Sequence, residues 1–471
     1  MTQDFIKQVK NKEIDIVEHI HKVIEEVKKI NKEYHYFNVI SEELALEQAK
    51  ELKKNPKGKL AGVVVSVKDC ICVKGLESRA GSAILDGYKP VFDSTVIEKV
   101  KKEGAIIIGK TAQDAFGFGG FSTNVGLGFK VPLNPLDKTR SCGGSSGGSA
   151  GVTKLATFPH ISLAESTGGS IVNPASFCGV VGLCPTYGRV SRYGLIDYAN
   201  SLDKIGPMAK TTKDAALMLE VISGFDKNES TTINRSVDNY ASYLKKEIKN
   251  MKIGFLEEST SKGVDEAVKD RILDGVLKLE VDGAKVEEIN LPLTSKYSLY
   301  AYYLIAMAEA STNLAKYCGM RYGAHDSLEG NFNEYFSKVR SHNLNDESKR
   351  RIIVGTFTRM AGYRDAYYIK ATKVRTRIIE EYKRVLSKYD CIISPVTPIL
   401  PPKFDELEKL TPLQIYLLDN FTVGANLAGL PHMSVNVGFK ENLPIGMLLV
   451  GNHLEEGKLL QVGSKLEEKN G

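Results

Sequence analysis

The sequence has no long apolar run. None of its hydrophobic segments approaches the roughly 18 consecutive apolar residues that a membrane-spanning helix needs. Residues 1–16, MTQDFIKQVKNKEIDI, are polar and charged and lack the apolar centre of a signal peptide. These two absences predict a protein of the cytoplasm with no membrane contact.

Cysteine is scarce and shows no paired spacing. The chain of 471 residues has seven cysteines, at positions 70, 72, 142, 178, 184, 318 and 391. The nearest two, Cys70 and Cys72, form C-x-C rather than C-x-x-C, and no histidine lies nearby in the sequence. An odd, scattered set is typical of reduced thiols, so we expect neither a disulfide framework nor a zinc or redox site.

The sequence also has little excess of either positive or negative charge. The 63 lysines and arginines exceed the 57 acidic residues by only six, and no long basic run occurs. This balance permits contact with nucleic acid but does not indicate it. With 42% hydrophobic and 25% charged residues, the composition is that of a globular protein long enough to fold without disulfides or metals.

The sequence does contain alternating helix and strand patterns. Apolar residues recur at helical spacing through residues 3–30, which predicts helices. Short apolar runs rich in β-branched residues predict strands at 61–67 and 105–109. Between them, a T-x-x-E capping box at Thr95 and a glycine stop at Gly104 predict a helix. Strand–helix–strand order favours an α/β fold.

The later part of the chain continues this alternation. We expect a surface loop at 225–240, a strand at 251–258, a helix at 264–282, mostly helix through 298–390, a strand at 391–398, and a helix with two apolar runs over 411–452.

A glycine- and serine-rich stretch occupies residues 117–151. It is not expected to be a flexible linker, because apolar segments on both sides continue the α/β pattern. Its centre, GGSSGGSAG, lacks the G-K-[ST] ending of a P-loop. It matches G-x-S-x-G in frames centred on Ser145 and Ser146, but the polar segment LNPLDKTRSC before it is not the strand that an α/β-hydrolase nucleophile elbow requires.

Two further segments carry candidate chemistry. VVVSVKD places Lys68 at the end of an apolar strand, and STGGSIVNPASFCGVVG places Ser170 after two glycines. Such a glycine turn can aim backbone N–H groups at one point, as an oxyanion hole does. Taken singly, a lysine there is usually a solvated charge and a serine after glycines is usually a turn residue. Their combination with the GGSSGG loop favours a site.

Together these segments resemble the amidase signature family. CGVVGLCPTYGRVSRYGL (178–195), NSLDKIG (200–206) and GPMAKTTKDAALMLEVISG (206–224) extend the resemblance, which covers about residues 5–465. Within the family, residues 348–375 and NLAGLP (426–431) resemble the A subunits of tRNA-dependent amidotransferases more than free amidases. FPHISLAESTGGS (158–170) resembles the archaeal form of these proteins.

The resemblance implies a fold and a domain plan. The expected fold is α/β, with a large mixed central β-sheet covered by helices on both faces. We expect a single amidase domain over residues 1–471. Its parts would be N-terminal helices at 1–57, a signature core at 58–222, and the rest of the sheet with a helical substrate-pocket region at 251–471.

The resemblance also assigns a catalytic triad. Ser170 is the expected nucleophile, Ser145 bridges and follows a cis peptide bond, and Lys68 is the base. A hydroxyl needs a base to become a good nucleophile, and a lysine can serve only when neutral, which burial favours. The backbone N–H groups of Thr167, Gly168, Gly169 and Ser170 would form the oxyanion hole.

The expected substrate is glutamine, which carries one charge of each sign besides its amide. By resemblance, Arg351 binds the carboxylate, Asp419 binds the ammonium and Tyr302 lines the pocket. A guanidinium suits a carboxylate because it can donate two parallel hydrogen bonds. From the residues alone, Arg351 in KRR is more typical of a surface charge, and the adjacent Arg350 is an alternative for its role.

The chain departs from the family around the nucleophile. Ser166 stands where an aspartate is common, Val172 stands where an arginine is common, and the spacing from Ser145 to Ser170 is one residue longer. The groups that support the Ser170 turn are therefore expected to differ.

By resemblance the activity is that of a glutaminase in a heterotrimer with amidotransferase B and C subunits. The complex would convert Glu-tRNA(Gln) to Gln-tRNA(Gln), with Asp-tRNA(Asn) as a further candidate, and tRNA would contact mainly the partner. We expect no cofactor on this chain, with ATP and Mg²⁺ acting at the B subunit. The alternatives are a stand-alone amidase of the same family and a catalytically silent scaffold subunit.

Overall fold

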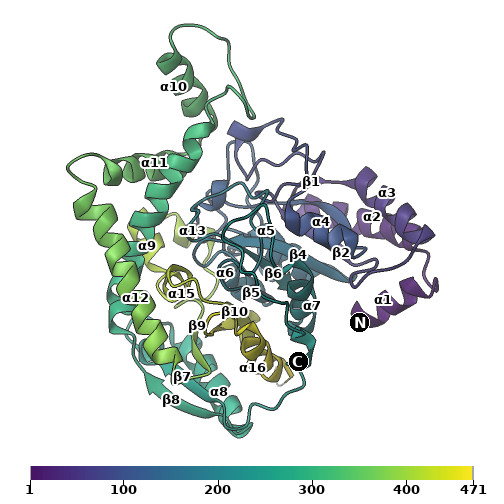
Figure 1. Ribbon diagram of the computed structural model, residues 1–471, viewed down its shortest axis with the longest axis vertical. Coiled ribbons are helices and arrows are strands. Elements are labelled where there is room, and N and C mark those ends of the chain that lie inside the picture. Colours follow the sequence, from purple (N-terminus) through teal and green to yellow (C-terminus); the bar gives the residue numbers. More distant parts are fainter. Residues whose placement is uncertain (1, 469–471) are drawn as a thin grey trace.

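An eleven-stranded mixed sheet forms the centre of the computed structural model, which describes residues 2–468 (Figure 1). Its strand order is β1-β3-β2-β4-β6-β5-β10-β11-β9-β7-β8. The strands are β1 Phe37–Ile40, β2 Val64–Lys68, β3 Ile106–Thr111, β4 His160–Ser166, β5 Val181–Cys184, β6 Lys204–Ala209, β7 Lys252–Leu256, β8 Lys285–Ile289, β9 Cys391–Pro395, β10 His432–Lys440 and β11 Leu443–Val450.

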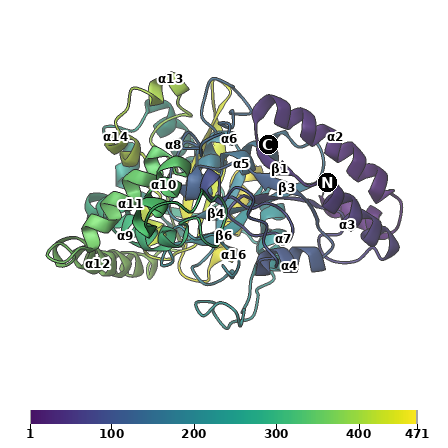
Figure 2. The same cartoon turned by 90° about the horizontal axis from the view of Figure 1, so that it is seen from above.

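Helices cover both faces and both ends of this sheet. They are α1 Thr2–Lys10, α2 Ile16–Tyr34, α3 Glu42–Lys54, α4 Thr95–Lys102, α5 Gly147–Leu155, α6 Val172–Cys178, α7 Thr212–Ile222, α8 Glu266–Val281, α9 Pro292–Asn313, α10 Phe332–Asn343, α11 Asp346–Arg359, α12 Lys370–Leu386, α13 Phe404–Leu407, α14 Pro412–Leu417, α15 Val423–Leu427 and α16 Glu456–Glu468. In Figures 1 and 2, α1–α3 gather at one end and α9–α12 at the other.

The two faces of the sheet follow from strand alternation. On β10, Met433 and Val435 point to Gly463 of α16, whereas Ser434 between them points to Ser176 of α6. Helices α7 and α8 pack against α16, and α5 packs against α6. The expectation of a mixed sheet with helices on both faces is confirmed.

Most expected elements are confirmed, with shifted ends. The strand expected at 61–67 begins at Val64 and includes Lys68, and the helix expected at 264–282 is α8. The capping box at Thr95 is wrong. Helix α4 begins at Thr95 itself, and the Thr95 hydroxyl donates to Asp226, a distant residue, so it caps no helix N–H group. Gly104 does follow the helix, with a positive φ of 81°.

The parallel pairing of β2 with β4 places the site. Because both strands run the same way, Lys68 at the end of β2 and Ser166 at the end of β4 lie at one edge of the sheet. The stretch 117–151 folds over this edge as a largely buried loop that leads into α5, so it is not a linker. No strand directly precedes Ser145 in this loop, as expected.

Three other expectations concern the whole chain. None of the helices in the described residues is long and apolar enough to span a membrane. All seven cysteines are free thiols, six of them buried. The division into 1–57, 58–222 and 251–471 stays a prediction.

Candidate active site

Lys68 and Ser145 meet beneath the surface at the end of β2. The Lys68 side chain is fully buried, and its Nζ donates to Ser145 Oγ at 2.8 Å. The peptide bond between Gly144 and Ser145 is cis, as the resemblance implied. The backbone of Ser145 is fixed from the other side, because its carbonyl accepts from the N–H of Asp114.

Ser170 lies on the turn between β4 and α6. Ser170 is 6% exposed, and its side chain makes no hydrogen bond within residues 2–468. The backbone N–H groups of residues 167–170 likewise find no acceptor in that part of the chain. A polar turn with unused donors beside a hydroxyl is the arrangement that binds a developing oxyanion.

The two glycines of the turn let other side chains approach closely. A Cβ added at Gly168 would lie 2.8 Å from the Tyr302 hydroxyl, and one added at Gly169 would lie 2.8 Å from Thr422 Oγ1. Both distances are shorter than real Cβ contacts, so a larger residue would push the pocket wall away. The glycines are required by packing here rather than by a left-handed backbone.

The family departures near Ser170 have structural replacements. Ser166 Oγ donates to the carbonyl of Gly168 at 2.9 Å, and the Asn426 side-chain amide donates to the same oxygen. Val172 is fully buried at the start of α6. The turn is therefore held by neutral donors on the Gly168 carbonyl.

Sequence reasoning missed a buried acidic cluster behind the triad. Glu165, the residue before Ser166, accepts from Lys68 Nζ through its carbonyl at 2.8 Å and its Oε2 at 2.9 Å. Thr167 Oγ1 lies 2.8 Å from Glu165 Oε1 and 2.8 Å from Asp203 Oδ1. Burial and the charge of Glu165 raise the pKa of Asp203 well above its usual range. The adjacency of Glu165 to the TGGS motif was the signal available in the sequence.

Arg351 is buried, so the view of it as a surface charge is wrong. It is 2% exposed; its Nε donates to Glu347 at 2.7 Å and its Nη1 donates to the Tyr198 hydroxyl at 2.6 Å. Burial would lower the pKa of Arg351, but Tyr198 and Glu347 raise it well above its usual range. Arg350 also pairs with Glu347 but has a 43% exposed side chain, so Arg351 is the better placed of the two.

Aromatic rings surround this guanidinium. Its central carbon lies 5.1 to 5.7 Å from the ring centres of Phe118, Tyr198, Tyr303 and Tyr416. Rings in this position attract a cation through their electron-rich faces. This cage of rings, together with the Glu347 carboxylate and the Tyr198 hydroxyl, holds the Arg351 charge in place.

Tyr302 and Asp419 both lie near the glycine turn. Tyr302 is buried with its hydroxyl against Gly168. Asp419 Oδ2 accepts from the Tyr303 hydroxyl at 2.6 Å, and the Asp419 carbonyl accepts from Thr422, the residue against Gly169. Burial raises the pKa of Asp419. Tyr302 thus contacts the turn that carries Ser170, and Asp419 reaches it through Thr422. Arg351 lies against Tyr303, which donates to Asp419.

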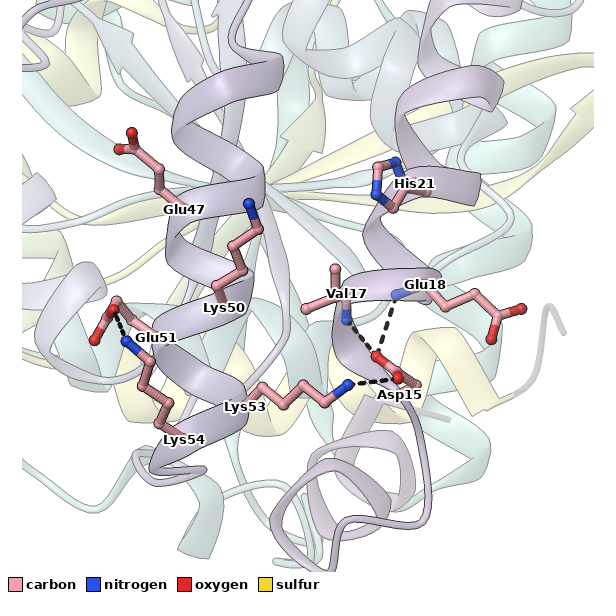
Figure 3. A pocket seen from close by; sticks show the side chains of 9 residues that line it. All are labelled: Asp15, Val17, Glu18, His21, Glu47, Lys50, Glu51, Lys53 and Lys54. Carbon is pink, nitrogen blue, oxygen red and sulfur yellow. Dashed lines mark hydrogen bonds and ion pairs between the residues drawn. The ribbon is translucent and has the colours of Figure 1, made fainter.

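A cavity of about 1000 Å³ lies elsewhere, between α2 and α3 (Figure 3). Its walls carry charges of both signs, including Asp15, which caps α2 and pairs with Lys53 at 2.7 Å. It holds no serine, cysteine or buried lysine. The geometry for nucleophilic chemistry is therefore at the β2–β4 edge and not in this groove.

Known proteins share both the sequence and the fold. A family profile described as Amidase matches residues 18–460. The chain is 47% identical to the A subunit of glutamyl-tRNA(Gln) amidotransferase from Halothermothrix orenii, covering 87% of this chain and 85% of that one. It is 44% identical to the protein of the same name from the archaeon Methanococcoides burtonii, covering 90% and 88%.

A solved structure agrees. The crystal structure of the glutamyl-tRNA(Gln) amidotransferase A subunit from Thermotoga maritima superposes with a TM-score of 0.80 at 38% identity, covering 96% of this chain and 92% of that one. The profile match and these identities extend over most of the chain. The chain belongs to the amidase family, among members named as the A subunit of glutamyl-tRNA(Gln) amidotransferase.

Proposed function

We propose that this chain is the glutamine-hydrolysing subunit of a glutamyl-tRNA(Gln) amidotransferase. The observation that carries the proposal is the contact between buried Lys68 and Ser145 beside the open N–H groups of the Ser170 turn. The named relatives, similar over most of their length, support the same conclusion. The free ammonia that such a protein makes would be lost to water without a partner that consumes it.

In the proposed reaction, Ser170 Oγ attacks the side-chain amide carbon of glutamine. The oxyanion that forms accepts hydrogen bonds from the N–H groups of Thr167, Gly168, Gly169 and Ser170. Ser145 carries the Ser170 proton towards Lys68 and returns it to the leaving nitrogen, so ammonia departs. Water then attacks the acyl-enzyme by the same route and releases glutamate.

The proposed pocket recognises the two charges of free glutamine. Arg351 keeps further guanidinium N–H groups that find no acceptor in the described chain, and these would bind the α-carboxylate. Asp419 would bind the α-ammonium, and Tyr302, against Gly168, would line the pocket. An apolar amide would offer no group to pair with either charge, which disfavours a free amidase for such substrates.

The proposal places the chain in a cytoplasmic heterotrimer with B and C subunits. ATP, Mg²⁺ and tRNA would act mainly at the B subunit. Among the described residues, no three His, Cys, Asp or Glu side chains gather so as to hold a metal ion.

The test is to co-express the chain with B and C subunits and measure glutamine hydrolysis with and without aminoacylated tRNA. We expect hydrolysis that needs the partners, and a Ser170→Ala complex at least about 1000-fold slower. Full activity of the chain alone would indicate a stand-alone amidase. Hydrolysis that survives Ser170→Ala would contradict the triad, and a wild-type complex without hydrolysis would indicate a scaffold.

A further inference from the structure

The three close contacts of Lys68 Nζ match the charged form of the amine. Its Nζ lies within 2.9 Å of three acceptors, which are Ser145 Oγ, the Glu165 carbonyl and Glu165 Oε2. An ammonium has three N–H groups and no acceptor site, so three acceptors match the charged form. A general base must be able to accept a proton. Lys68 therefore has to pass a proton on before it can take one from Ser145.

Glu165 is the group placed to receive that proton. Of the three partners of Nζ, only its carboxylate is a base near neutral pH. Oε2 lies 2.9 Å from Nζ, a normal hydrogen-bond distance, and Glu165 is 3% exposed, so water does not compete for the contact. A proton that moves from Lys68 to Glu165 turns the buried ion pair into two neutral groups, and Lys68 then has the lone pair that accepts the Ser145 proton.

On its far side, Glu165 contacts the hydroxyl of Thr167, which also contacts Asp203. Thr167 Oγ1 lies 2.8 Å from both Glu165 Oε1 and Asp203 Oδ1, yet a hydroxyl has a single proton to donate. One carboxyl must therefore donate to the Thr167 oxygen. The pKa of Asp203 is raised well above its usual range by burial and by Glu165, so Asp203 holds that proton. Thr167 then donates to Glu165 Oε1.

We propose that Glu165 is the terminal proton acceptor of the Ser170–Ser145–Lys68 triad, and that Lys68 relays rather than keeps the proton. The inference rests on the proposed triad. Glu165 touches no reacting atom and acts through Lys68. This role of Glu165 goes beyond the family resemblance, which assigned no role to position 165.

The proton count balances. As Ser170 Oγ bonds to the amide carbon, its proton passes to Ser145 Oγ, the Ser145 proton passes to Lys68 Nζ, and a Lys68 proton passes to Glu165 Oε2. Lys68 stays positive, Glu165 becomes neutral, and the negative charge lies on the oxyanion. When the carbon–nitrogen bond breaks, the same steps reverse, the leaving nitrogen takes the proton, and Glu165 regains its charge.

Among residues 2–468, Lys68 is the cationic side chain in direct contact with Glu165. The titratable side chains that face it are Lys68 from β2, Cys70 after β2, Cys184 from β5, Asp203 before β6 and Tyr302 from α9. Burial raises the pKa of both thiols and of the Tyr302 hydroxyl, so these are neutral near neutral pH. Asp114, whose backbone N–H donates to the Ser145 carbonyl, also interacts with Lys68, and burial raises the pKa of Asp114 to about 6. Asp114 is unaltered in Glu165→Gln, so a change in pH dependence in that variant comes from the loss of the Glu165 carboxylate.

The experiment measures how fast a fluorophosphonate probe labels Ser170 as pH varies, using the assembled complex. In wild type, the labelling rate falls on the acid side of its pH profile, and this fall (the acid limb) reports protonation of the Lys68–Glu165 pair. In Glu165→Gln no carboxylate remains, so Lys68 itself must lose a proton, and an amine does so at higher pH than a carboxylic acid. We expect the acid limb to move to higher pH and labelling below it to slow by at least about 100-fold.

Two other results would overturn the proposal. An unmoved acid limb with uniformly slower labelling would make Glu165 merely structural. A limb that moves to lower pH would mean that Glu165 only holds Lys68 charged and that Lys68 is the terminal base. Glu165→Asp keeps the carboxylate, so its limb should stay near that of wild type although labelling slows; a limb displaced upward as in Glu165→Gln would also contradict the relay.

A matched control is Glu381→Gln. Glu381 is equally buried, and its carboxylate accepts from the N–H groups of Leu293 and Thr294 at the start of α9, so the variant should leave the acid limb in place. Failure of this inference is distinct from failure of the proposed function. If wild-type Ser170 is not labelled at all, the proposed triad is wrong. If Ser170 is labelled but the acid limb stays in place in Glu165→Gln, only the role proposed for Glu165 is ruled out.

Discussion

At the scale of residues, the site is made of buried polar groups whose partners lie within the fold. Arg351 donates hydrogen bonds to Glu347 and Tyr198, and Lys68 donates to Ser145 and Glu165. Burying a charge without a partner would cost several kcal/mol, so each of these pairs fixes the position of its members. Ser170 and the N–H groups of its turn are the exception, and they are the groups that would bind the reacting amide.

Replacing Asp419 by Asn tests how glutamine is recognised. Asn keeps the size and the contact with the Tyr303 hydroxyl but removes the charge that would pair with the α-ammonium. We expect the KM for glutamine to rise about tenfold or more, which corresponds to about 1.5 kcal/mol or more for a lost charged hydrogen bond. Burial raises the pKa of Asp419, so glutamine binding should also weaken as pH falls and the carboxylate gains a proton.

Steady-state kinetics of the assembled complex measure this. The control is Asp405→Asn, the same change on an exposed position of α13, which should leave the KM unaltered. An unchanged KM in Asp419→Asn would remove Asp419 from the site.

The sequence indicated the triad because its members lie in compact motifs. It did not indicate Glu165 or Asp203, since their roles depend on which strand ends meet in space. Lys68 comes from β2, Glu165 from β4, and Asp203 from the residue before β6, and no spacing in the sequence relates the three. The burial of Arg351 was missed for the same reason, because its cage is drawn from several distant segments.

At the scale of elements, α11 links the proposed substrate pocket to the loop over the proposed triad. Asn345 caps this helix by accepting from the N–H of Ser348, and its side-chain amide donates to the carbonyls of Asn124 and Val125. The same helix carries Arg351. One side chain thus fixes the helix start and the active-site loop together.

Asn345→Ala should therefore affect both stability and substrate binding. Loss of the cap costs about 1 kcal/mol, and release of the loop should raise the KM for glutamine several-fold. Asn331→Ala is a matched control, because Asn331 caps the protruding helix α10 in the same way but contacts no active-site loop (Figure 1). The midpoint temperature of thermal unfolding should fall in both variants. An equal rise of the KM for glutamine in both would contradict the specific link through α11.

Periodicity and turn residues located most elements, because those signals are local. The first and last residues of the helices and strands were less predictable. Thr95 has the sequence of a cap, yet its hydroxyl is used by Asp226 from a distant segment, and the helix begins at Thr95 itself, one residue earlier than a cap at this position requires. Tertiary contacts override local signals in such places.

At the scale of the molecule, the sheet order is what composition and periodicity could not supply. Strand β5 precedes β6 in the chain, yet β6 lies between β4 and β5 in the sheet. Pairing of this kind is set by contacts between distant segments, and only the family resemblance implied the large mixed sheet. Its consequence is functional, because it brings the ends of β2 and β4 to one edge and places α9, α11 and the Asp419 segment around the Ser170 turn.

The most direct test of the account is to trap the acyl-enzyme. The assembled complex would be mixed with glutamine, quenched in acid within one turnover, digested and examined by mass spectrometry. The account predicts a γ-glutamyl ester on Ser170, absent from Ser170→Ala and longer-lived in Lys68→Ala if any forms. An ester on Ser145 or Ser146 instead, or steady hydrolysis of glutamine by Ser170→Ala, would contradict it.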